Sequence, residues 1–287
     1  MMLLSATEVI AQRVFNTLYI YTDTVFLIAL LVLLAVQKKY CTLLFGLFGG
    51  VLYMIVDYGI FHLALGTRSI EGGSLFWVLL WMSMSYGITN FVWMWLWMAR
   101  DKHAKEYTLL IVVWWIAAPM IAQTFGGSMP QIKIQRTTGS YHGYMALILA
   151  VGYIAAIVYN LFRKDKTQHF PLLRLLAIGI SVQFAWEFCL LLGGIRSAEF
   201  TDYASKLHTL AVNSLLETNL GAVPIYCIYL LVSGVVSEDL KRKTPRVLFA
   251  DRMAQLNAKP VKSVASAPDT AGSVDTVATA DTPQSRD

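Results

Sequence analysis

The chain has 287 residues, of which 56% are hydrophobic, 14% are charged and 13% are aromatic, and its formal net charge is +5. A soluble domain usually carries about 25% charged residues, so this composition excludes an ordinary cytosolic enzyme, a secreted disulfide scaffold and a nucleic-acid binder. Cys41, Cys189 and Cys227 lie in apolar blocks and form no CxxC motif. No disulfide framework or cysteine metal site is therefore expected.

Seven apolar blocks follow an N-terminal segment at residues 1–17, and each has about the length that crosses a bilayer as a helix. A hydrocarbon layer offers the backbone no water, so only helices or a closed barrel can cross it. The blocks are continuously apolar rather than alternating. We therefore predict an all-α fold, a polytopic membrane bundle of seven transmembrane helices within residues 18–243. The predicted spans lie at about 18–37, 41–65, 74–99, 107–124, 140–163, 172–193 and 209–234.

The orientation follows from lysine and arginine in the loops, because cytoplasmic loops carry an excess of these residues. One side carries twelve of them, namely Lys38, Lys39, Arg100, Lys102, Lys105, Arg163, Lys164, Lys166, Lys241, Arg242, Lys243 and Arg246. The other side carries six, namely Arg13, Arg68, Lys133, Arg136, Arg196 and Lys206. This bias predicts an outside or lumenal N-terminus and a cytoplasmic C-terminus. The membrane would be the endoplasmic reticulum membrane in a eukaryote and the plasma membrane in a bacterium.

The last part of the chain, at 244–287, is rich in Ala, Ser, Thr, Asp and Pro and lacks a large apolar block. Such a segment cannot bury enough apolar surface to offset the entropy of ordering it. We predict a disordered cytoplasmic tail.

One sequence pattern occurs twice. The two stretches are Asp57-Tyr58 with Gly66, Arg68-Ser69 and Glu71, and Glu187-Phe188 with Gly194, Arg196-Ser197 and Glu199. A span begins soon after each stretch. Spans one to three could therefore repeat as spans five to seven, with span four between them, as in some transporters.

Three acidic residues lie well inside predicted spans: Asp57 in the second, Glu187 in the sixth and Glu217 in the seventh. A charge at the bilayer centre costs about 3 kcal/mol, so such residues normally face a bundle interior or a wet cavity. Apart from Arg174, the same spans hold no lysine or arginine to pair with them. The three carboxyl groups are expected at similar depth in one pocket, where they are protonated, hydrogen-bonded or in contact with a cation.

Polar and aromatic residues at helical spacing supply the expected walls of this pocket. The candidate substrate-binding residues are Asp23, Tyr53, Tyr86, Asn90, Gln183, Trp186 and Asn213. Two other interpretations remain open, since tryptophans near span ends often form the interfacial belt and buried asparagines often link helices.

Several seven-helix functions lack their required residues. A retinal protein needs a lysine deep in its last span, and residues 209–234 contain none. His62, His142 and His208 show no HxxxH or HExxH spacing, so no zinc site is expected. The helix-end motifs of common seven-helix receptors are also missing.

Two functional hypotheses fit these residues. In the first, Glu187, Glu217 and Asp57 are catalytic groups for a lipophilic small molecule that enters from the bilayer. A buried, protonated carboxyl group would protonate an epoxide or alkene of an isoprenoid chain, and aromatic faces would stabilise the carbocation. This reaction needs no metal and no cofactor. In the second, the acids are the coupling groups of a small-solute transporter. A non-catalytic assembly factor would leave the polar pocket without a use.

The Trp186-Glu187 pair inside a span, a second intramembrane acid at Glu217 and seven helices resemble the membrane-integral terpene cyclases of fungal meroterpenoid biosynthesis. The resemblance implies a metal-independent, proton-initiated cyclisation that uses two intramembrane acids, with Glu187 matching the acid of the Trp-Glu pair. In that family the pair falls early in the chain and an aspartate falls in the last span. Here the pair lies in span six and the last span carries a glutamate.

Overall fold

The structure is a computed structural model, and it describes residues 11–136, 141–196 and 203–236. The chain divides into two units, Met1–Arg242 and Lys243–Asp287, and all described residues lie in the first. The tail predicted at 244–287 lies outside the described residues.

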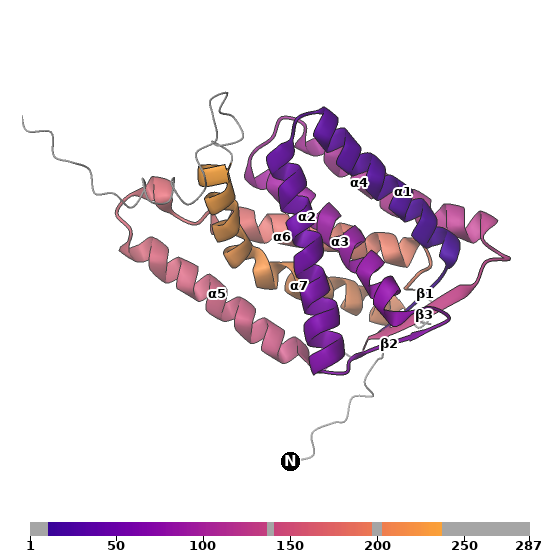
Figure 1. The fold of residues 1–287 in the computed structure, drawn as a ribbon. Coiled ribbons are helices and arrows are strands. Elements are labelled where there is room, and N and C mark those ends of the chain that lie inside the picture. Colours follow the sequence, from indigo (N-terminus) through magenta and orange to yellow (C-terminus); the bar gives the residue numbers. More distant parts are fainter. Residues whose placement is uncertain (1–10, 137–140, 197–202, 237–287) are drawn as a thin grey trace, which may run out of the picture. The chain divides into compact units, whose positions relative to one another are not determined.

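The described chain contains seven helices that are long and apolar enough to cross a membrane, as expected for an integral multi-pass membrane protein (Figure 1). This confirms the seven predicted helices, whose bounds were placed within a few residues. They are α1 (Thr17–Val36), α2 (Tyr40–Met54) continued by the π-helical segment η1 (Ile55–Ala64), α3 (Leu75–Met98), α4 (Ala104–Phe125), α5 (His142–Phe162), α6 (Leu172–Leu192) and α7 (Tyr203–Leu231) continued by η4 (Val232–Val236). A short 3-10 helix, η3 (Lys166–Gln168), precedes α6.

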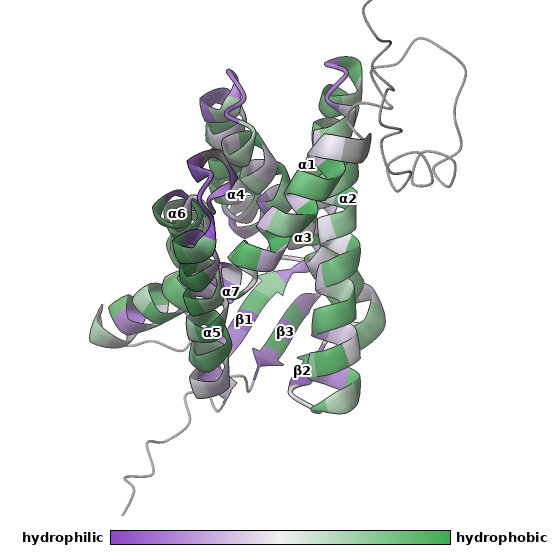
Figure 2. Ribbon diagram, turned by 90° about the vertical axis from the view of Figure 1, so that its left-hand side faces the viewer, coloured by the Kyte–Doolittle hydropathy of each residue, from purple (hydrophilic) through white to green (hydrophobic). Residues whose placement is uncertain are grey.

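A small antiparallel sheet was not predicted, and the all-α class is wrong in this respect. Its strands are β1 (Ala11–Asn16), β2 (Arg68–Glu71) and β3 (Gln131–Arg136), in the order β1-β3-β2. The strands come from the segment before α1 and from the loops after η1 and α4, so all three lie at the same end of the helices (Figure 2). Residues 1–17, predicted as a plain lumenal segment, thus contribute an edge strand.

One face of the sheet carries isoleucines, a phenylalanine and arginines and lies against the helices, and the other face is mainly polar. Phe15 is paired with Ile132, and Ile70 with Ile134, and residues directly opposite in an antiparallel pair share a face. Ile132 and Ile134 are 2% and 0% exposed. The alternating sequence Gln131-Ile132-Lys133-Ile134-Gln135 therefore packs its isoleucines against the helices and turns its polar residues away.

Helix α3 lies at the centre of the bundle and contacts α1, α2, α4, α6 and α7. Leu79, Phe91 and Leu96 on this helix are fully buried. The α2 and α3 backbones approach closely at Gly87, where an added Cβ would lie 2.5 Å from the Gly49 carbonyl oxygen. In contrast, α5 packs mainly against α7 and buries only Ala156. Residues of α3 and its neighbours therefore form the interior in which a site can be enclosed.

Candidate functional site

Four arginine residues lie where the helix-facing side of the sheet adjoins the helix ends. Arg13 faces Ile134 across β1 and β3, and Arg68 faces Arg136 across β2 and β3, which places these three arginines on the helix-facing side. The fourth, Arg196, follows Ile195, whose carbonyl accepts a 3.0 Å hydrogen bond from the Val14 backbone N–H. The order across the sheet is therefore Arg196, Arg13, Arg136 and Arg68.

Asp57 on η1 lies under β2 and β3. Its Oδ1 accepts a 2.8 Å hydrogen bond from Arg68 Nε and lies 2.7 Å from Arg68 Nη2. Arg136 Nη2 is 3.5 Å from the same oxygen. Arg68 Nη1 also donates to the backbone carbonyl and hydroxyl of Thr67. Asp57 and Arg68 thus form a close, well-coordinated ion pair.

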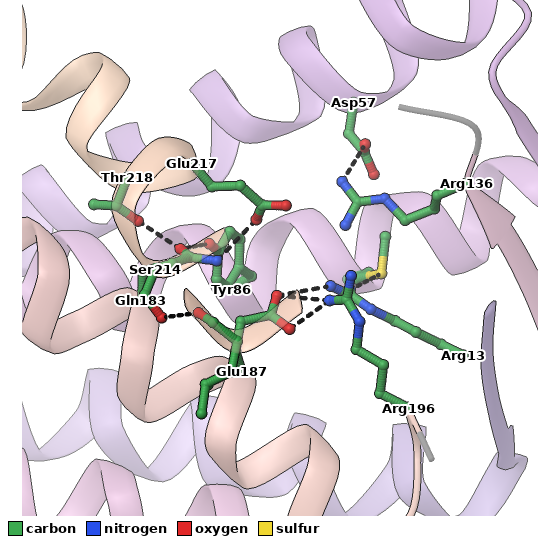
Figure 3. Close-up of polar contacts among 12 residues, drawn as sticks. Arg13, Asp57, Tyr86, Arg136, Gln183, Glu187, Arg196, Ser214, Glu217 and Thr218 are labelled. Carbon is green, nitrogen blue, oxygen red and sulfur yellow. Dashed lines mark hydrogen bonds and ion pairs between the residues drawn. The ribbon is translucent and has the colours of Figure 1, made fainter. Parts of the chain in front are cut away.

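Glu187 on α6 is fully buried and makes the second ion pair. Arg196 Nη1 donates to both carboxylate oxygens, at 2.6 and 2.5 Å, and Arg13 Nη2 lies 3.9 Å from Oε1 (Figure 3). Arg13 also lies 6.0 Å from the Trp186 ring centre. Glu187 is therefore compensated mainly by Arg196.

The cationic partners of the acids come from outside the membrane spans. The acids lack basic partners in their own spans, but arginines of the sheet and of the loop after α6 reach them. Burial, together with Arg136 and Arg196, lowers the pKa of the Arg13 guanidinium to about 10, and burial with Arg136 lowers the pKa of Arg68 to about 10. For Arg136, Asp57 and the two glutamates outweigh burial and raise the pKa above its usual value. All three arginines are therefore cationic at neutral pH.

Glu217 differs from the other two acids, because no arginine or lysine of the described chain lies within ion-pair distance of it. Its carboxylate accepts a 2.8 Å hydrogen bond from Gln183 Nε2. Gln183 Oε1 accepts hydrogen bonds from the Thr218 hydroxyl, at 2.6 Å, and from the Tyr86 hydroxyl. Gln183 is fully buried. The amide therefore fixes the glutamate of α7 to α6 and α3 (Figure 3).

Aromatic side chains adjoin this network. The Tyr86 ring packs against Tyr53 at 4.7 Å and against Trp186 at 5.0 Å. Trp186 packs in turn against Trp115 at 5.0 Å, and Trp115 stacks on Trp93 at 6.0 Å. These three tryptophans are buried, so they belong to the interior rather than to an interfacial belt.

The other candidate residues lie in the same interior but outside the network of Glu217 and Gln183. Asn90 is fully buried, and neither of its amide atoms has a hydrogen-bond partner in the described chain. Asn213 is 3% exposed, with its amide nitrogen unpartnered there as well. Asp23 is 1% exposed and accepts a 3.0 Å hydrogen bond from Trp81 Nε1. It makes no ion pair within residues 11–136, 141–196 and 203–236.

Within the described residues, no group of three or more His, Cys, Asp and Glu side chains could hold a metal ion. Comparison of the chain with family models, with curated proteins and with solved structures found no match. The site must therefore be interpreted from its own geometry.

The sequence predicts Asp57, Glu187 and Glu217 at one depth in a single pocket, and the depth stays a prediction. In the structure each acid has its own partner, namely Arg68, Arg196 and Gln183 respectively. None of the three acids lines the cavity beside Trp186. Sequence reasoning missed the arginines, which were assigned to loops as topology signals. The repeated pattern offered a signal for two of them, because Arg68 and Arg196 occupy equivalent positions after Asp57 and Glu187.

Proposed function

We propose that the chain is an integral membrane enzyme that cyclises an isoprenoid or meroterpenoid substrate without a metal, with Glu217 as the proton donor. The membrane is that of the endoplasmic reticulum in a eukaryote and the plasma membrane in a bacterium. The observation that carries the proposal is the difference among the three acids. Asp57 and Glu187 form ion pairs with arginines, whereas Glu217 is held by the neutral amide of Gln183.

The sequence predicts a catalytic role for Asp57, Glu187 and Glu217 alike. Their different partners indicate different roles. A carboxylate in a close ion pair with arginine is stabilised in its ionised form. Asp57 and Glu187 are therefore assigned to electrostatic and positioning roles. Glu217 can carry the proton because, within the described residues, no arginine or lysine lies at ion-pair distance from its carboxyl group. The charges of Arg13, Arg68 and Arg136 act on it only from farther away.

The proposed reaction begins when the Glu217 carboxyl group donates its proton to an epoxide oxygen or an alkene carbon. Protonation of the epoxide leads to cleavage of one C–O bond, whose electron pair stays on the oxygen as a hydroxyl group, and protonation of the alkene uses its π bond to form the new C–H bond. In either case the electron pair of a further double bond attacks the cationic carbon and closes a ring. The rings of Tyr53, Tyr86 and Trp186 would stabilise the migrating positive charge. Loss of a proton to the Glu217 carboxylate ends the reaction. The product is an isomer of the substrate, and the enzyme returns to its initial state.

The charge distribution supports the proposed orientation, with the sheet on the outer or lumenal side. Of the basic residues at the sheet end, Arg13, Arg68 and Arg196 are buried in the ion-paired cluster. The exposed basic residues of the described loops are at the opposite end, namely Lys38, Arg100, Lys102, Lys105, Arg163, Lys164 and Lys166. The bias expected for a cytoplasmic face therefore becomes stronger once buried charges are set aside.

The decisive experiment measures conversion of a prenylated aromatic epoxide by purified protein in detergent that contains a chelator. We expect Glu217→Gln, which keeps the shape of the side chain, to abolish product. Glu71→Gln makes the same chemical change on exposed residue Glu71 of β2 and should retain full turnover. Full turnover by Glu217→Gln would refute the assignment.

A small-solute transporter remains the second candidate, and the repeated acid and arginine pairs favour it. Asp57 and Glu187 occupy equivalent places in spans two and six, and each pairs with an arginine that follows its span, as expected for a 3+1+3 arrangement. Uptake into sealed vesicles distinguishes the two functions. Solute flux without conversion of a prenylated substrate would favour transport, and conversion without flux would favour the enzyme.

A further inference from the structure

Among the described residues, no carboxylate oxygen lies closer than 3.5 Å to two of the four arginines beneath the sheet, Arg13 and Arg136. Arg13 donates from Nη1 to the Met82 thioether sulfur at 3.1 Å, and its nearest carboxylate oxygen, on Glu187, is 3.9 Å away. Arg136 reaches Asp57 only at 3.5 Å. The Nε atoms of both arginines are buried, and neither has a hydrogen-bond partner in the described chain. Each guanidinium group therefore has an N–H donor without an acceptor in the described chain.

Arg13 and Arg136 differ from Arg68 and Arg196 in their distance from the acids. Arg68 takes the close position beside Asp57, and Arg196 takes the close position beside Glu187. A sulfur atom is only a weak acceptor, and Arg13 is a buried cation whose weak partners do not offset its burial. Arg136 is better compensated, because Asp57 accepts a hydrogen bond from it at 3.5 Å. Arg136 also faces Arg68 directly across the strands, an arrangement of like charges that is unfavourable.

We propose that Arg13 and Arg136 form a binding site for an oxyanion, a carboxylate or phosphate group, carried by an amphiphilic molecule. The planar guanidinium group presents paired N–H donors that match the paired oxygens of these groups. One such group between Arg13 and Arg136 would accept the unused N–H donors and reduce the repulsion among the four arginines. Since the sheet lies directly at the helix ends, an acidic headgroup can bind there while its apolar chain extends along the bundle.

The proposed oxyanion site is not preformed, because Arg136 does not line the cavity beside Arg13 and a whole carboxylate or phosphate group requires side chains to move there. This cavity has a volume of about 10 Å³ and is lined also by Tyr19, Ser85 and Trp186. That volume admits roughly one water-sized atom. The unbranched Met82 side chain lines the same cavity, and methionine repacks readily. A carboxylate oxygen can therefore replace the sulfur as the acceptor for Arg13.

The test measures binding by titration of the purified full-length chain in neutral detergent, followed by native mass spectrometry. The probes are oleate, dioleoyl phosphatidate and inorganic phosphate, with oleyl alcohol as the neutral control. Saturable binding of oleate or phosphatidate, without binding of the alcohol, supports the site for an amphiphile. Binding of inorganic phosphate alone supports the same oxyanion site but identifies the source as a free ion. Absence of binding by all three anions overturns the proposal.

Two variants locate the site. Arg13→Gln and Arg136→Gln should each weaken binding of the anionic probe at least tenfold. Lys133→Gln is the matched control, because Lys133 lies on the same strand as Arg136 but on the opposite face. It should change the affinity less than twofold. Equal binding by the wild type and both arginine variants, or an equal loss in Lys133→Gln, contradicts the assignment.

A second measurement separates ligand binding from a purely structural role. Without ligand, Arg13→Gln should unfold at the wild-type temperature or above, because it removes a cation that is poorly compensated. Wild-type protein should gain thermal stability on adding the anion, and Arg13→Gln should not. A lower unfolding temperature of ligand-free Arg13→Gln would instead identify Arg13 as a structural counter-ion of Glu187 and overturn the proposal. None of these readouts requires turnover, so the site and the proposed cyclisation can fail separately.

Discussion

The two acid–arginine motifs, residues 57–68 and residues 187–196, use the same parts at different spacing. Each begins with a buried acid near the end of a helix and ends with the arginine that pairs with it. Each has a glycine with positive φ two residues before that arginine, Gly66 at 62° and Gly194 at 68°. A left-handed residue at this place turns the chain back toward the acid.

The first motif is two residues longer, and its helical part differs accordingly. Ile55–Ala64 is π-helical, whereas Leu172–Leu192 remains α-helical through the second acid. A π-helix has more residues in each turn than an α-helix. The additional residues are therefore accommodated without moving Arg68 away from Asp57. The ion pair is thus common to both motifs, and the helix type differs between them.

The residue one turn before each acid makes the functional difference. In the first motif it is Tyr53, whose ring packs on Tyr86. In the second it is Gln183, which bonds to both Glu217 and Tyr86. Within the described residues, the hydrogen bond to the third carboxyl group, Glu217, therefore comes from the second motif. Both motifs have the same kind of ion pair, and they differ in this hydrogen bond.

The largest effect is expected from breaking the arginine pairs. Arg196→Gln should lower the free energy of unfolding by about 3–5 kcal/mol, since it leaves a buried carboxylate uncompensated. Arg68→Gln should cost less, because Asp57 keeps Arg136 at 3.5 Å while Glu187 keeps Arg13 only at 3.9 Å. Unfolding by dodecyl sulfate in mixed micelles measures both.

A double variant checks the physical reason. Arg196→Gln combined with Glu187→Gln removes both charges and should recover a substantial part of the lost stability. If the double variant is as unstable as Arg196→Gln, the loss comes from packing and the electrostatic explanation is wrong.

The second prediction compares the residues one turn before the acids. Gln183→Leu removes the amide that holds Glu217 and should reduce turnover about 100-fold, since proton transfer depends on the position of the acid. Tyr53→Phe keeps the ring that packs on Tyr86 and should retain turnover within about threefold of the wild type. The measurement is the turnover rate of each variant at saturating substrate. Equal losses in the two variants would remove the functional distinction between the motifs.

The sequence was sufficient for the helices, because apolar blocks of about 20 residues set the seven spans. The common depth of Asp57, Glu187 and Glu217, which follows from the alternation of span direction, stays a prediction. The sequence was not sufficient for the sheet. Gln131–Arg136 alternates in polarity, but a six-residue strand in a polar loop is a faint signal, and its partners lie far away in the sequence.

The large sequence separation of the paired strands also prevented prediction of the arginines at the site. Arg13 and Arg136 meet because β1 and β3 pair, and neither strand carries information about the other in a single sequence. Loop arginines are first interpreted as topology signals. The repeated spacing of Asp57 with Arg68 and Glu187 with Arg196 was visible, but it was interpreted as a repeat and not as two ion pairs.

The third prediction concerns the helix pairs that carry the motifs. At Gly87, an added Cβ meets the α2 backbone, 2.5 Å from the Gly49 carbonyl oxygen and 2.7 Å from the Gly50 Cα. At Gly179, an added Cβ meets the side chain of Asn219 on α7 rather than backbone atoms. Gly87→Ala should therefore cost about 1–3 kcal/mol, and Gly179→Ala should cost less. Unfolding in mixed micelles compares the two, and a larger loss at Gly179 would contradict the order.

The smallest effect is expected at the two turns. Gly66→Ala and Gly194→Ala should each cost about 1 kcal/mol, because a residue with a Cβ is strained at positive φ. No atom lies within 4 Å of a Cβ added at Gly66, so the backbone alone sets the cost there. Gly66→Asn should lose less than Gly66→Ala, since asparagine tolerates this conformation. Similar alanine losses at both turns would confirm that the motifs close in the same way. A stable Gly66→Ala protein would show that the first motif closes without a left-handed residue, and the equivalence of the two turns would then be lost.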